Sequence, residues 1–478
     1  AMRRPYDSYH NFQYVLPGRY RDRGNRSKFV RRDVKCKVWK TEEFGNAPLY
    51  LLDTDVPGNE DGWITGQLYG WFGEERIAQE MVLGIGGVKA LRALGIPIDV
   101  YHFNEGHALF AGFELIREKM EEKGISYEQA FQATREEIVF TTHTPVIQGN
   151  ESHYIDRLMY MGADNGCLNR KSFQSLGGRP FNMTVGALRL SRKSNAVAQL
   201  HGVTANKMWK KVKDRSEIVA ITNGIHRPTW VDERMVDAAE NGGDLWSIHQ
   251  ENKQSLINFV KERTGVSLNM DSLLIGFSRR TVAYKRGDFI FSDREVIEPL
   301  FKEGKLQIVF SGKAHPLDDG GKKIVARIVA LSKEFPNSVA FLENYDMTIG
   351  AMLTRGSDLW LNNPRRPKEA SGTSGMKAAM NGALNFSTLD GWWPEACEHG
   401  VNGWQFGDAY ENEDEEILDA HDLKAMYQVL LDEVMPTYYE NREKWVEMMK
   451  ASILSTKDPF SVKRMLEEYY ELLYKKAE

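Results

Sequence analysis

The feature that most restricts the fold is a repeated alternation of short apolar runs with helical patterns. Residues 138–140, 218–221 and 273–277 are such runs, and each is followed by polar residues. Apolar strands that alternate with helices indicate a parallel sheet with helices on both faces. The alternation forms two series, separated by a polar and mostly helical passage at residues 242–264. A chain of 478 residues can also hold two sizeable domains, so we predict an α/β protein of two domains.

The domain limits follow from where the two series begin and end. We expect the first domain to span residues 1–255 and the second to span residues 256–445, followed by C-terminal helices at residues 446–478. Residues 1–30 show no clear period and are predicted to be loop, whereas residues 34–39 alternate as a half-buried strand does.

Polar residues stand where the predicted strands of the first domain end. Asn104, Glu105 and His107 follow one strand, His143 follows the next, and Asn223 follows a third. Ligands of parallel sheets bind beyond the carboxyl ends of the strands, so these side chains are predicted to line one crevice. Each of them is also compatible with an ordinary structural role, because Asn-Gly forms turns and single histidines are often hydrogen-bonded structural residues.

A Gly/Ser/Thr loop, EASGTSGM at residues 369–376, leads into a predicted helix in the second domain. Such a loop presents unpaired backbone N–H groups at the positive end of the helix dipole and therefore favours an anion. Lys377 follows among apolar neighbours, which would lower its pKa, as an imine-forming amine requires. Most glycine-rich turns before helices are only tight turns, however, and this one does not match the usual phosphate-loop pattern.

A dense basic group follows the strand at residues 273–277. It consists of Arg279, Arg280 and Lys285. Arginine and lysine on a loop are surface residues by default. Their place at the carboxyl end of a strand, in the same domain as the glycine-rich loop, favours phosphate recognition, because guanidinium groups match phosphate oxygens.

Composition excludes several other functions. The net charge of −5 and the pI near 6.2 give no support to nucleic-acid binding. Cys36, Cys167 and Cys397 are far apart and form no metal-binding or disulfide pattern, so we expect no metal and a reducing cytoplasm. No run of about 18 apolar residues is present, and we expect no membrane segment.

The motifs together resemble the α-glucan phosphorylases, the glycogen, starch and maltodextrin phosphorylases, in their shorter bacterial and archaeal form. The resemblance is carried by EASGTSGMKAAMNGAL, SRRTVAYKR, TTHTPV, FNEGHALF, TNGIHRPTW, ENYD and LDGWWPE. It implies the glycosyltransferase-B fold, in which two Rossmann-like domains face a central cleft and the final helices return to the N-terminal domain.

The resemblance also implies the roles of individual residues. Lys377 would carry pyridoxal 5'-phosphate as a Schiff base, and Gly372, Thr373, Arg279 and Tyr345 would contact the cofactor. Arg280 and Lys285 would bind inorganic phosphate or the phosphate of glucose 1-phosphate. The residues implied for sugar binding are Glu369, Asn223, Asn104, Glu105, His107 and His143. The reaction implied is the retaining phosphorolysis of α-1,4-glucan to glucose 1-phosphate, with the cofactor phosphate as proton donor and acceptor.

The resemblance departs from the family at several places. Arg279 stands where many long-type members have lysine, Glu105 where many have aspartate, and Asp346 where an arginine is common. The resemblance covers residues 34–478, and we find no glycine-rich GGLG-type loop before residue 34. We therefore expect an N-terminal domain that lacks its start, and the activity of this chain stays open.

Three functions are therefore compatible with the sequence. The first is a glucan phosphorylase, whose partners would be α-glucan and phosphate and which is also compatible with a homo-oligomer. The second is a nucleotide-sugar glycosyltransferase of the same fold, which would not need Lys377. The third is a non-catalytic remnant that binds glucan or cofactor.

Overall fold

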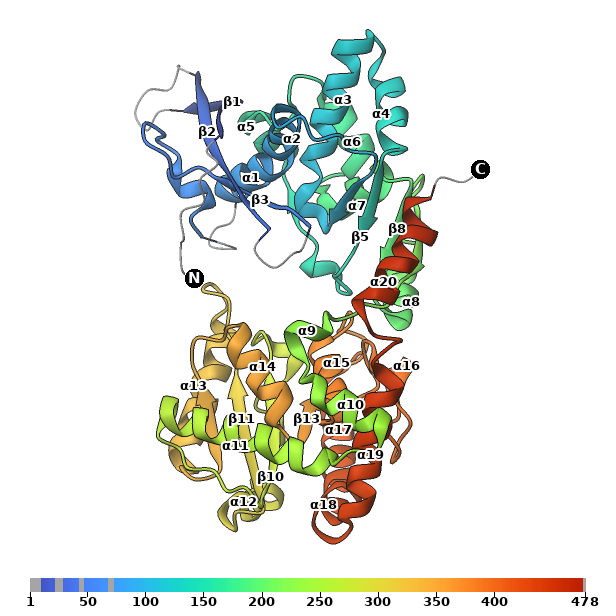
Figure 1. The fold of residues 1–478 in the computed structure, drawn as a ribbon. Coiled ribbons are helices and arrows are strands. Elements are labelled where there is room, and N and C mark those ends of the chain that lie inside the picture. The colour runs from blue at the N-terminus through green and yellow to red at the C-terminus, as the bar shows by residue number, and fades with distance from the viewer. Residues whose placement is uncertain (1–9, 22–28, 43–46, 68–72, 476–478) are drawn as a thin grey trace. The chain divides into compact units, whose positions relative to one another are not determined.

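The computed structural model describes residues 10–21, 29–42, 47–67 and 73–475. The chain forms two compact units (Figure 1). Unit 1 comprises Ala1–Asn195, Asn206–Val219 and Lys476–Glu478, and unit 2 comprises Ala196–Ala205 and Ala220–Lys475. This division lies upstream of the boundary predicted at residues 255/256, and the domain limits given above stay a prediction. None of the helices in the described residues combines the length and the apolar character of a membrane span.

Unit 1 contains a three-stranded antiparallel sheet. Its strands, in order, are β1 (His10–Arg21), β2 (Phe29–Thr41) and β3 (Leu49–Asp53). The prediction of loop for residues 1–30 is wrong where β1 lies, while residues 1–9 and 22–28 are outside the described residues. The pairing of β1 with β2 shifts register between Tyr14 and Gly18. Such an irregularity breaks the two-residue period, so the sequence shows no continuous alternation there.

The second sheet of unit 1 has the strand order β4-β5-β8-β9, and β4, β5 and β8 pair in parallel. Its strands are β4 (Tyr101–Asn104), β5 (Ile138–Thr141), β8 (Lys193–Ala196) and β9 (Glu217–Ala220). All four residues of β5 are buried, as expected for a parallel strand that is covered on both faces. The residues that follow β4 and β5 therefore lie at the same edge of the sheet, as the sequence predicted.

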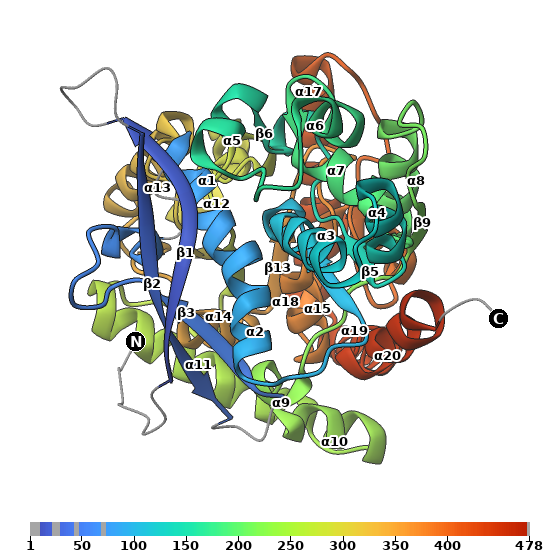
Figure 2. The ribbon, with the colours of Figure 1, turned by 90° about the horizontal axis from the view of Figure 1, so that it is seen from above.

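Helices connect and cover the strands of unit 1. They are α1 (Glu74–Met81), α2 (Gly87–Ala93), α3 (Phe110–Lys123), α4 (Tyr127–Arg135), α5 (Ile155–Met161), α6 (Arg170–Gly177) and α7 (Met183–Leu190), with the π-helix η2 (Val82–Gly86) between α1 and α2. Short elements are η1 (Gly62–Thr65), η3 (Gly106–Ala108), η4 (Ile147–Gly149), β6 (Ser152–His153) and β7 (Phe181–Asn182). A Cβ on Gly84 of η2 would lie 2.5 Å from the backbone N of Ala111 in α3, so glycine permits this close helix contact. Figure 2 shows β1, β2 and β3 beside the continuous stretch α1–η2–α2.

Unit 2 is built on a six-stranded parallel sheet with the order β12-β11-β10-β13-β14-β15. The strands are β10 (Leu273–Ser278), β11 (Leu306–Ser311), β12 (Val339–Leu342), β13 (Leu359–Asn362), β14 (Leu384–Thr388) and β15 (Gly403–Phe406). The strand order reverses between β10 and β13. In open parallel sheets, ligands bind beyond the carboxyl ends of the strands at such a reversal. The predicted basic group follows β10. The Gly/Ser/Thr loop that is predicted to bind an anion, called the anion loop below, follows β13.

Helices cover both faces of this sheet. The helices of unit 2 are α9 (Arg227–Trp230), α10 (Glu233–Asn241), α11 (Leu245–Thr264), α12 (Arg294–Lys302), α13 (Asp319–Glu334), α14 (Met347–Gly356), α15 (Thr373–Met380), α16 (Trp393–Ala396), α17 (Glu415–Val429), α18 (Met435–Glu440), α19 (Arg442–Thr456) and α20 (Val462–Glu468). The remaining elements are α8 (Gln199–Met208), which spans the border of the units, η5 (Ala283–Lys285), η6 (Phe289–Phe291), η7 (Leu430–Val434) and η8 (Tyr469–Tyr474). Leu273 and Ile275 of β10 belong to one apolar core, and Leu274 belongs to the core on the other face, with α11, α14 and α15. This alternation shows why the strand reads as one continuous apolar run.

A buried ion network joins α11 to the sheet. Lys253 and Asp358 are both fully buried, and Lys253 Nζ lies 2.7 Å from Asp358 Oδ2. Lys253 Nζ also donates to Ser272 O at 2.7 Å and to the Tyr438 hydroxyl at 3.0 Å. Asp358 accepts the backbone N–H of Leu274 at 2.8 Å. A buried charge is costly once its partner is removed. The network therefore favours the one alignment of α11 with β10 and β13 in which these charges are paired.

Candidate active site

The loop at residues 363–372 connects β13 with α15 at the reversal of strand order in unit 2. The N-cap residue of α15 is Gly372, and no side chain caps the helix. Gly372 has φ 82° and ψ 52°, a left-handed conformation that a residue with a Cβ adopts only with strain. The first N–H groups of a helix have no partner within the helix. The helix start therefore presents donors, including that of Thr373, that suit an anion.

Lys377 lies in α15, one turn beyond this helix start. Its side chain is half-buried, and its Nζ lies 3.3 Å from the centre of the Trp230 ring in α9. Burial lowers the pKa of Lys377 to about 8. The indole ring attracts an ammonium group by about 1 kcal/mol, which would raise the pKa by less than about one. Burial therefore outweighs the ring, and the amine keeps a lowered pKa, as the sequence predicted.

Trp230 is held against Lys377 by the surrounding backbone and side chains. Asn381 donates one hydrogen bond to the carbonyl of Trp230 at 3.1 Å and another to the carbonyl of Lys377 at 2.8 Å. A Cβ on Gly350 of α14 would lie 2.6 Å from the Tyr345 hydroxyl and 3.2 Å from the Trp230 ring. Tyr345 and Trp230 therefore both pack on the same glycine, and Lys377 lies against the Trp230 ring.

Two of the three residues of the basic group after β10, Arg279 and Lys285, lie against Glu369 of the loop. Arg279 Nη1 lies 3.2 Å from Glu369 Oε2, and Lys285 Nζ lies 3.1 Å from the same oxygen. Arg279 is buried, and its Nε and Nη2 have no hydrogen-bond partner among the described residues. Buried polar groups are normally paired, so these two donors point to a further acceptor. Arg280 is exposed.

The charges of Glu369, Lys285 and Arg279 shift one another's pKa values. Burial alone would raise the pKa of Glu369, but the positive charges of Lys285 and Arg279 outweigh burial, and the pKa of Glu369 is lowered. Burial is also the main cause of the lowered pKa of Lys285 and of Arg279. Two cations thus share a single carboxylate, which leaves the group with an excess of positive charge. Such an excess suits a phosphate.

In unit 1 the residues after β4 and β5 contact one another. Glu105 has φ 67° and ψ 174°, a backbone conformation that residues other than glycine rarely adopt. Its carboxylate accepts the backbone N–H of His143, the Thr144 hydroxyl at 3.0 Å and the N–H of Gly106 at 3.3 Å. His143 Nε2 also forms a hydrogen bond with Asn104 Oδ1. The pKa of His143 is lowered, mainly by burial, so its imidazole is neutral and can act as a hydrogen-bond partner.

His107 belongs to a neighbouring ion network. Its Nδ1 lies 2.7 Å from Arg76 Nη2, 3.5 Å from Glu151 Oε2 and 3.8 Å from Glu80 Oε1. His153 Nε2 lies 2.8 Å from Glu80 Oε2. The nearby carboxylates of Glu151 and Glu80 raise the pKa of His107 to about 9, although burial and Arg76 oppose this shift.

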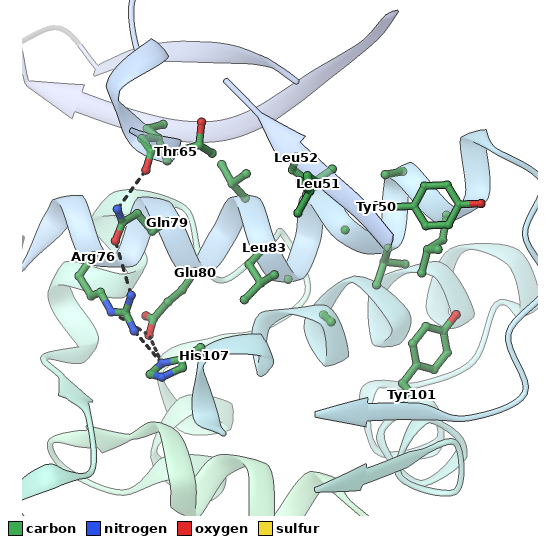
Figure 3. A pocket seen from close by; sticks show the side chains of 18 of the residues that line it. Tyr50, Leu51, Leu52, Thr65, Arg76, Gln79, Glu80, Leu83, Tyr101 and His107 are labelled. Carbon is green, nitrogen blue, oxygen red and sulfur yellow. Dashed lines mark hydrogen bonds and ion pairs between the residues drawn. The ribbon is translucent and has the colours of Figure 1, made fainter. Parts of the chain in front are cut away.

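The same network forms the polar end of a pocket within unit 1. The pocket has a volume of about 490 Å³ and a mostly apolar lining, and Figure 3 shows Arg76, Glu80 and His107 at one end of it. Ligand atoms of Glu80, Glu151 and His153 lie within 4.8 Å of one another, a spacing that a metal ion could use. Arg76 lies beside both carboxylates, at 3.0 Å from Glu151 and 3.8 Å from Glu80, so its charge already offsets part of theirs.

Asn223 follows β9 and lies in unit 2. Its N–H donates to the carbonyl of Val197 at 3.1 Å, and its carbonyl accepts from Arg464 Nη2 at 3.1 Å. A Cβ on the adjacent Gly224 would lie 2.2 Å from the backbone O of Ser461. The backbone at Asn223 is therefore fixed, while its side-chain amide forms no hydrogen bond with a described residue. The predicted residues thus fall into two groups, Asn104, Glu105, His107 and His143 in unit 1 and the others in unit 2, and the single crevice lined by all of them stays a prediction.

Sequence reasoning missed several residues of both groups. Trp230 lies within a motif that carried the resemblance, but nothing in its spacing marks it as the neighbour of Lys377. Arg76 and Glu80 lie one turn apart in α1, whereas Glu151 comes 75 positions after Arg76. Their only sequence signal is the placement of charged residues in and near apolar segments.

Comparison with known proteins identifies the family. The chain is 37% identical to the glycogen phosphorylase of Aquifex aeolicus over 502 residues, which cover 92% of this chain and 72% of that protein. The chain belongs to the carbohydrate phosphorylase family. The sequence model of that family, described as carbohydrate phosphorylase, matches residues 232–412, a range that contains both the basic group and Lys377.

Two further relatives of this phosphorylase-family chain differ in length. The maltodextrin phosphorylase of Thermococcus litoralis is 40% identical over 483 residues, which cover 91% of this chain but 58% of that protein. An uncharacterized protein of Methanocaldococcus jannaschii is 38% identical over 450 residues, which cover 92% of this chain and 82% of that protein. The predicted family and the predicted α/β class with parallel sheets are confirmed. The chain spans little more than half the length of the Thermococcus relative.

Proposed function

We propose that this chain carries out, or forms the core of a protein that carries out, the phosphorolysis of α-1,4-glucan to glucose 1-phosphate with retention of configuration. The observation that carries the proposal is the group around Lys377: a lysine of lowered pKa beside an uncapped helix start. The carbohydrate phosphorylase family, to which the chain belongs, supports it. Because the chain spans 58% of the Thermococcus maltodextrin phosphorylase, the activity of the whole protein is part of the proposal.

The residues of unit 2 fit pyridoxal 5'-phosphate as the cofactor. Lys377 would attach it covalently through the side-chain amine, with Tyr345 nearby. The N–H groups at Gly372 and Thr373 would hold its phosphate together with Arg279, whose Nε and Nη2 have no other partner among the described residues. When bound, the cofactor would supply through its 5'-phosphate a proton donor and acceptor for the substrate phosphate.

The basic side chains would bring the substrate phosphate to this place. Arg280 and Lys285 would bind inorganic phosphate or the phosphate of glucose 1-phosphate, and Lys285 is already oriented toward the site by Glu369 at 3.1 Å. Two phosphate groups repel each other strongly where water is excluded. Several cations are therefore the main requirement of the site, and Arg279, Arg280 and Lys285 would supply them.

Uncharged and carboxylate groups would bind the sugar. Glu369 and Asn223 in unit 2 would accept or donate hydrogen bonds to its hydroxyl groups, as would Asn104 and the neutral His143 in unit 1. His143 is fixed through its backbone N–H by the carboxylate of Glu105. The strained backbone of Glu105, with φ 67°, is typical of residues at functional sites.

The test is the release of glucose 1-phosphate from maltodextrin and inorganic phosphate by protein supplied with pyridoxal 5'-phosphate. We expect activity in the wild type, none in Lys377→Ala, and unchanged activity in Lys368→Ala. Lys368 is the matched control because it belongs to the same loop but pairs with Glu415. Cofactor binding without glucose 1-phosphate would leave only a binding role, and transfer from a nucleotide sugar that does not depend on Lys377 would favour the glycosyltransferase.

Localisation and assembly are also part of the proposal. Cys36, Cys167 and Cys397 are free thiols, which supports a reducing compartment such as the cytoplasm. A homo-oligomer stays a prediction from the family resemblance.

A further inference from the structure

The motif LDGWWPE contributes no residue to the proposed chemistry, yet its first part lies directly against the anion loop. Residues 389–392 form a tight turn between β14 and α16, and the N–H of Trp392 donates to the carbonyl of Ser371 at 2.8 Å. Ser371 directly precedes Gly372, the N-cap of α15. The turn is therefore hydrogen-bonded to the loop one residue before the helix start.

Asp390 in this turn is fully buried and bonds to the loop through its side chain. Its Oδ2 accepts the backbone N–H of Glu369 at 2.9 Å, and its Oδ1 accepts the N–H of Gly391 at 2.8 Å. A buried backbone N–H needs a partner, and Asp390 is the partner of Glu369. The side chain of Asp390 thus fixes the backbone from which the carboxylate of Glu369 extends to Arg279 and Lys285.

The fit of the turn against the loop leaves no room for larger residues. Gly391 has φ +59°, and a Cβ there would lie 2.3 Å from the carbonyl oxygen of Ser371. The ring of Trp392 closes the other side, because a Cβ on Gly375 would lie 2.8 Å from its Nε1. The backbone of the turn and the indole ring of Trp392 therefore fix the shape of the loop and of the first turn of α15.

We propose that the turn at residues 389–392 is a template for the anion loop, with Asp390 as the positioning residue of Glu369. Asp390 touches no reacting group and acts through Glu369. The proposal rests on the proposed function, since Glu369 is there a sugar contact. Asp390 holds the loop so that Glu369 lies between Arg279 and Lys285 at 3.2 and 3.1 Å, and without this bond the carboxylate loses that place.

If Asp390 only stabilised the fold, its substitution would lower the stability without changing the place of the Glu369 carboxylate. A buried carboxyl group that accepts two backbone N–H groups stabilises the fold wherever it lies. Asp293, which is only half-buried, provides a comparison away from the loop, because its Oδ1 also accepts two backbone N–H groups, those of Glu295 and Val296 at 3.1 and 3.4 Å, at the start of α12. Substitution of Asp293 affects stability without affecting the anion loop.

The experiment is a double-mutant cycle on kcat/KM for maltodextrin phosphorolysis. Asp390→Asn keeps the shape of the side chain but replaces one acceptor by a donor that opposes an N–H group. We expect it to lower kcat/KM by about 10- to 100-fold, and Glu369→Gln to lower it as well. In the Glu369→Gln background, Asp390→Asn should cost less than about 3-fold, because residues that act through one another are not additive. Asp293→Asn should leave kcat/KM within about 2-fold in both backgrounds.

Hydrogen exchange gives a second readout that does not require activity. Asp390→Asn should speed exchange of the Glu369 amide by at least about 10-fold relative to amides of β14, whereas Asp293→Asn should leave it unchanged. If Asp390→Asn does not fold, Gly391→Ala displaces the same turn through the contact with Ser371 and should give the same non-additive loss. Asp390→Asn could lower kcat/KM equally in both backgrounds, or leave the exchange rate of the Glu369 amide unchanged. Either result would overturn the proposal that Asp390 positions Glu369. A wild-type protein that makes no glucose 1-phosphate but shows the amide effect would overturn the proposed function alone.

Discussion

The lowered pKa of Lys377 predicts how fast the protein takes up its cofactor at each pH. Only the neutral amine attacks the aldehyde of pyridoxal 5'-phosphate. With a pKa of about 8 in place of the ordinary 10.5 of a lysine, about 9% of the amine is neutral at about pH 7, against about 0.03% for an ordinary lysine. The structure therefore predicts an amine that is about 300-fold more available near neutral pH.

The measurement is the rate of cofactor uptake by the apoprotein, followed by absorbance between about pH 6 and about pH 10. The rate should rise with pH and level off above a midpoint near 8. Trp230→Leu removes the ring that attracts the ammonium form, so its midpoint should be the same or slightly lower. Lys368→Ala should behave as the wild type does. A rate that still rises steeply at about pH 9, as it does for an ordinary lysine with pKa about 10.4, would refute the view that burial controls this amine.

Two further predictions concern the buried ion networks. Asp358→Asn leaves the fully buried Lys253 without its counter-charge and should lower the free energy of unfolding by about 3–5 kcal/mol. Asp346→Asn at the exposed start of α14 should cost less than about 0.5 kcal/mol, because Asn caps a helix about as well as Asp does; equal losses in urea denaturation would contradict the network. His107 should titrate near 9 in NMR and closer to its ordinary pKa in Glu151→Gln. Because this pKa is raised by folding, His107 contributes stability below about pH 6.5 that is lost as the pH rises through 9; a midpoint below 6.5 would show that Arg76, rather than the carboxylates, dominates.

The strands that sequence reasoning found are those whose burial shows as an uninterrupted apolar run. Residues 138–140 lie in β5, and residues 273–277 lie in β10. β8 gave no such signal, because its core positions include Ser194 and Asn195. Their burial costs little free energy because they hydrogen-bond to other polar side chains, as Ser194 does to Ser216. Polar strands of this kind can be recognised only when their partners are known.

The site was predictable where a local motif fixes its chemistry. The glycine at position 372 and the lysine one turn later are both read from one short segment, and the structure gives them the expected helix start and the expected lowered pKa. The place of Trp230 beside Lys377 depends on the packing of α9 against α14 and α15, which no local pattern encodes. The same holds for Asp390, whose bond to Glu369 joins residues 21 positions apart.

The central claim is that Lys377 carries the cofactor, and its most direct test is chemical. The protein is incubated with pyridoxal 5'-phosphate, reduced with borohydride, digested and analysed by mass spectrometry. The account predicts one reduced cofactor adduct, on the peptide that contains Lys377, and none in Lys377→Ala. A protein without an adduct, or one with the adduct on another residue such as Lys285, would contradict it.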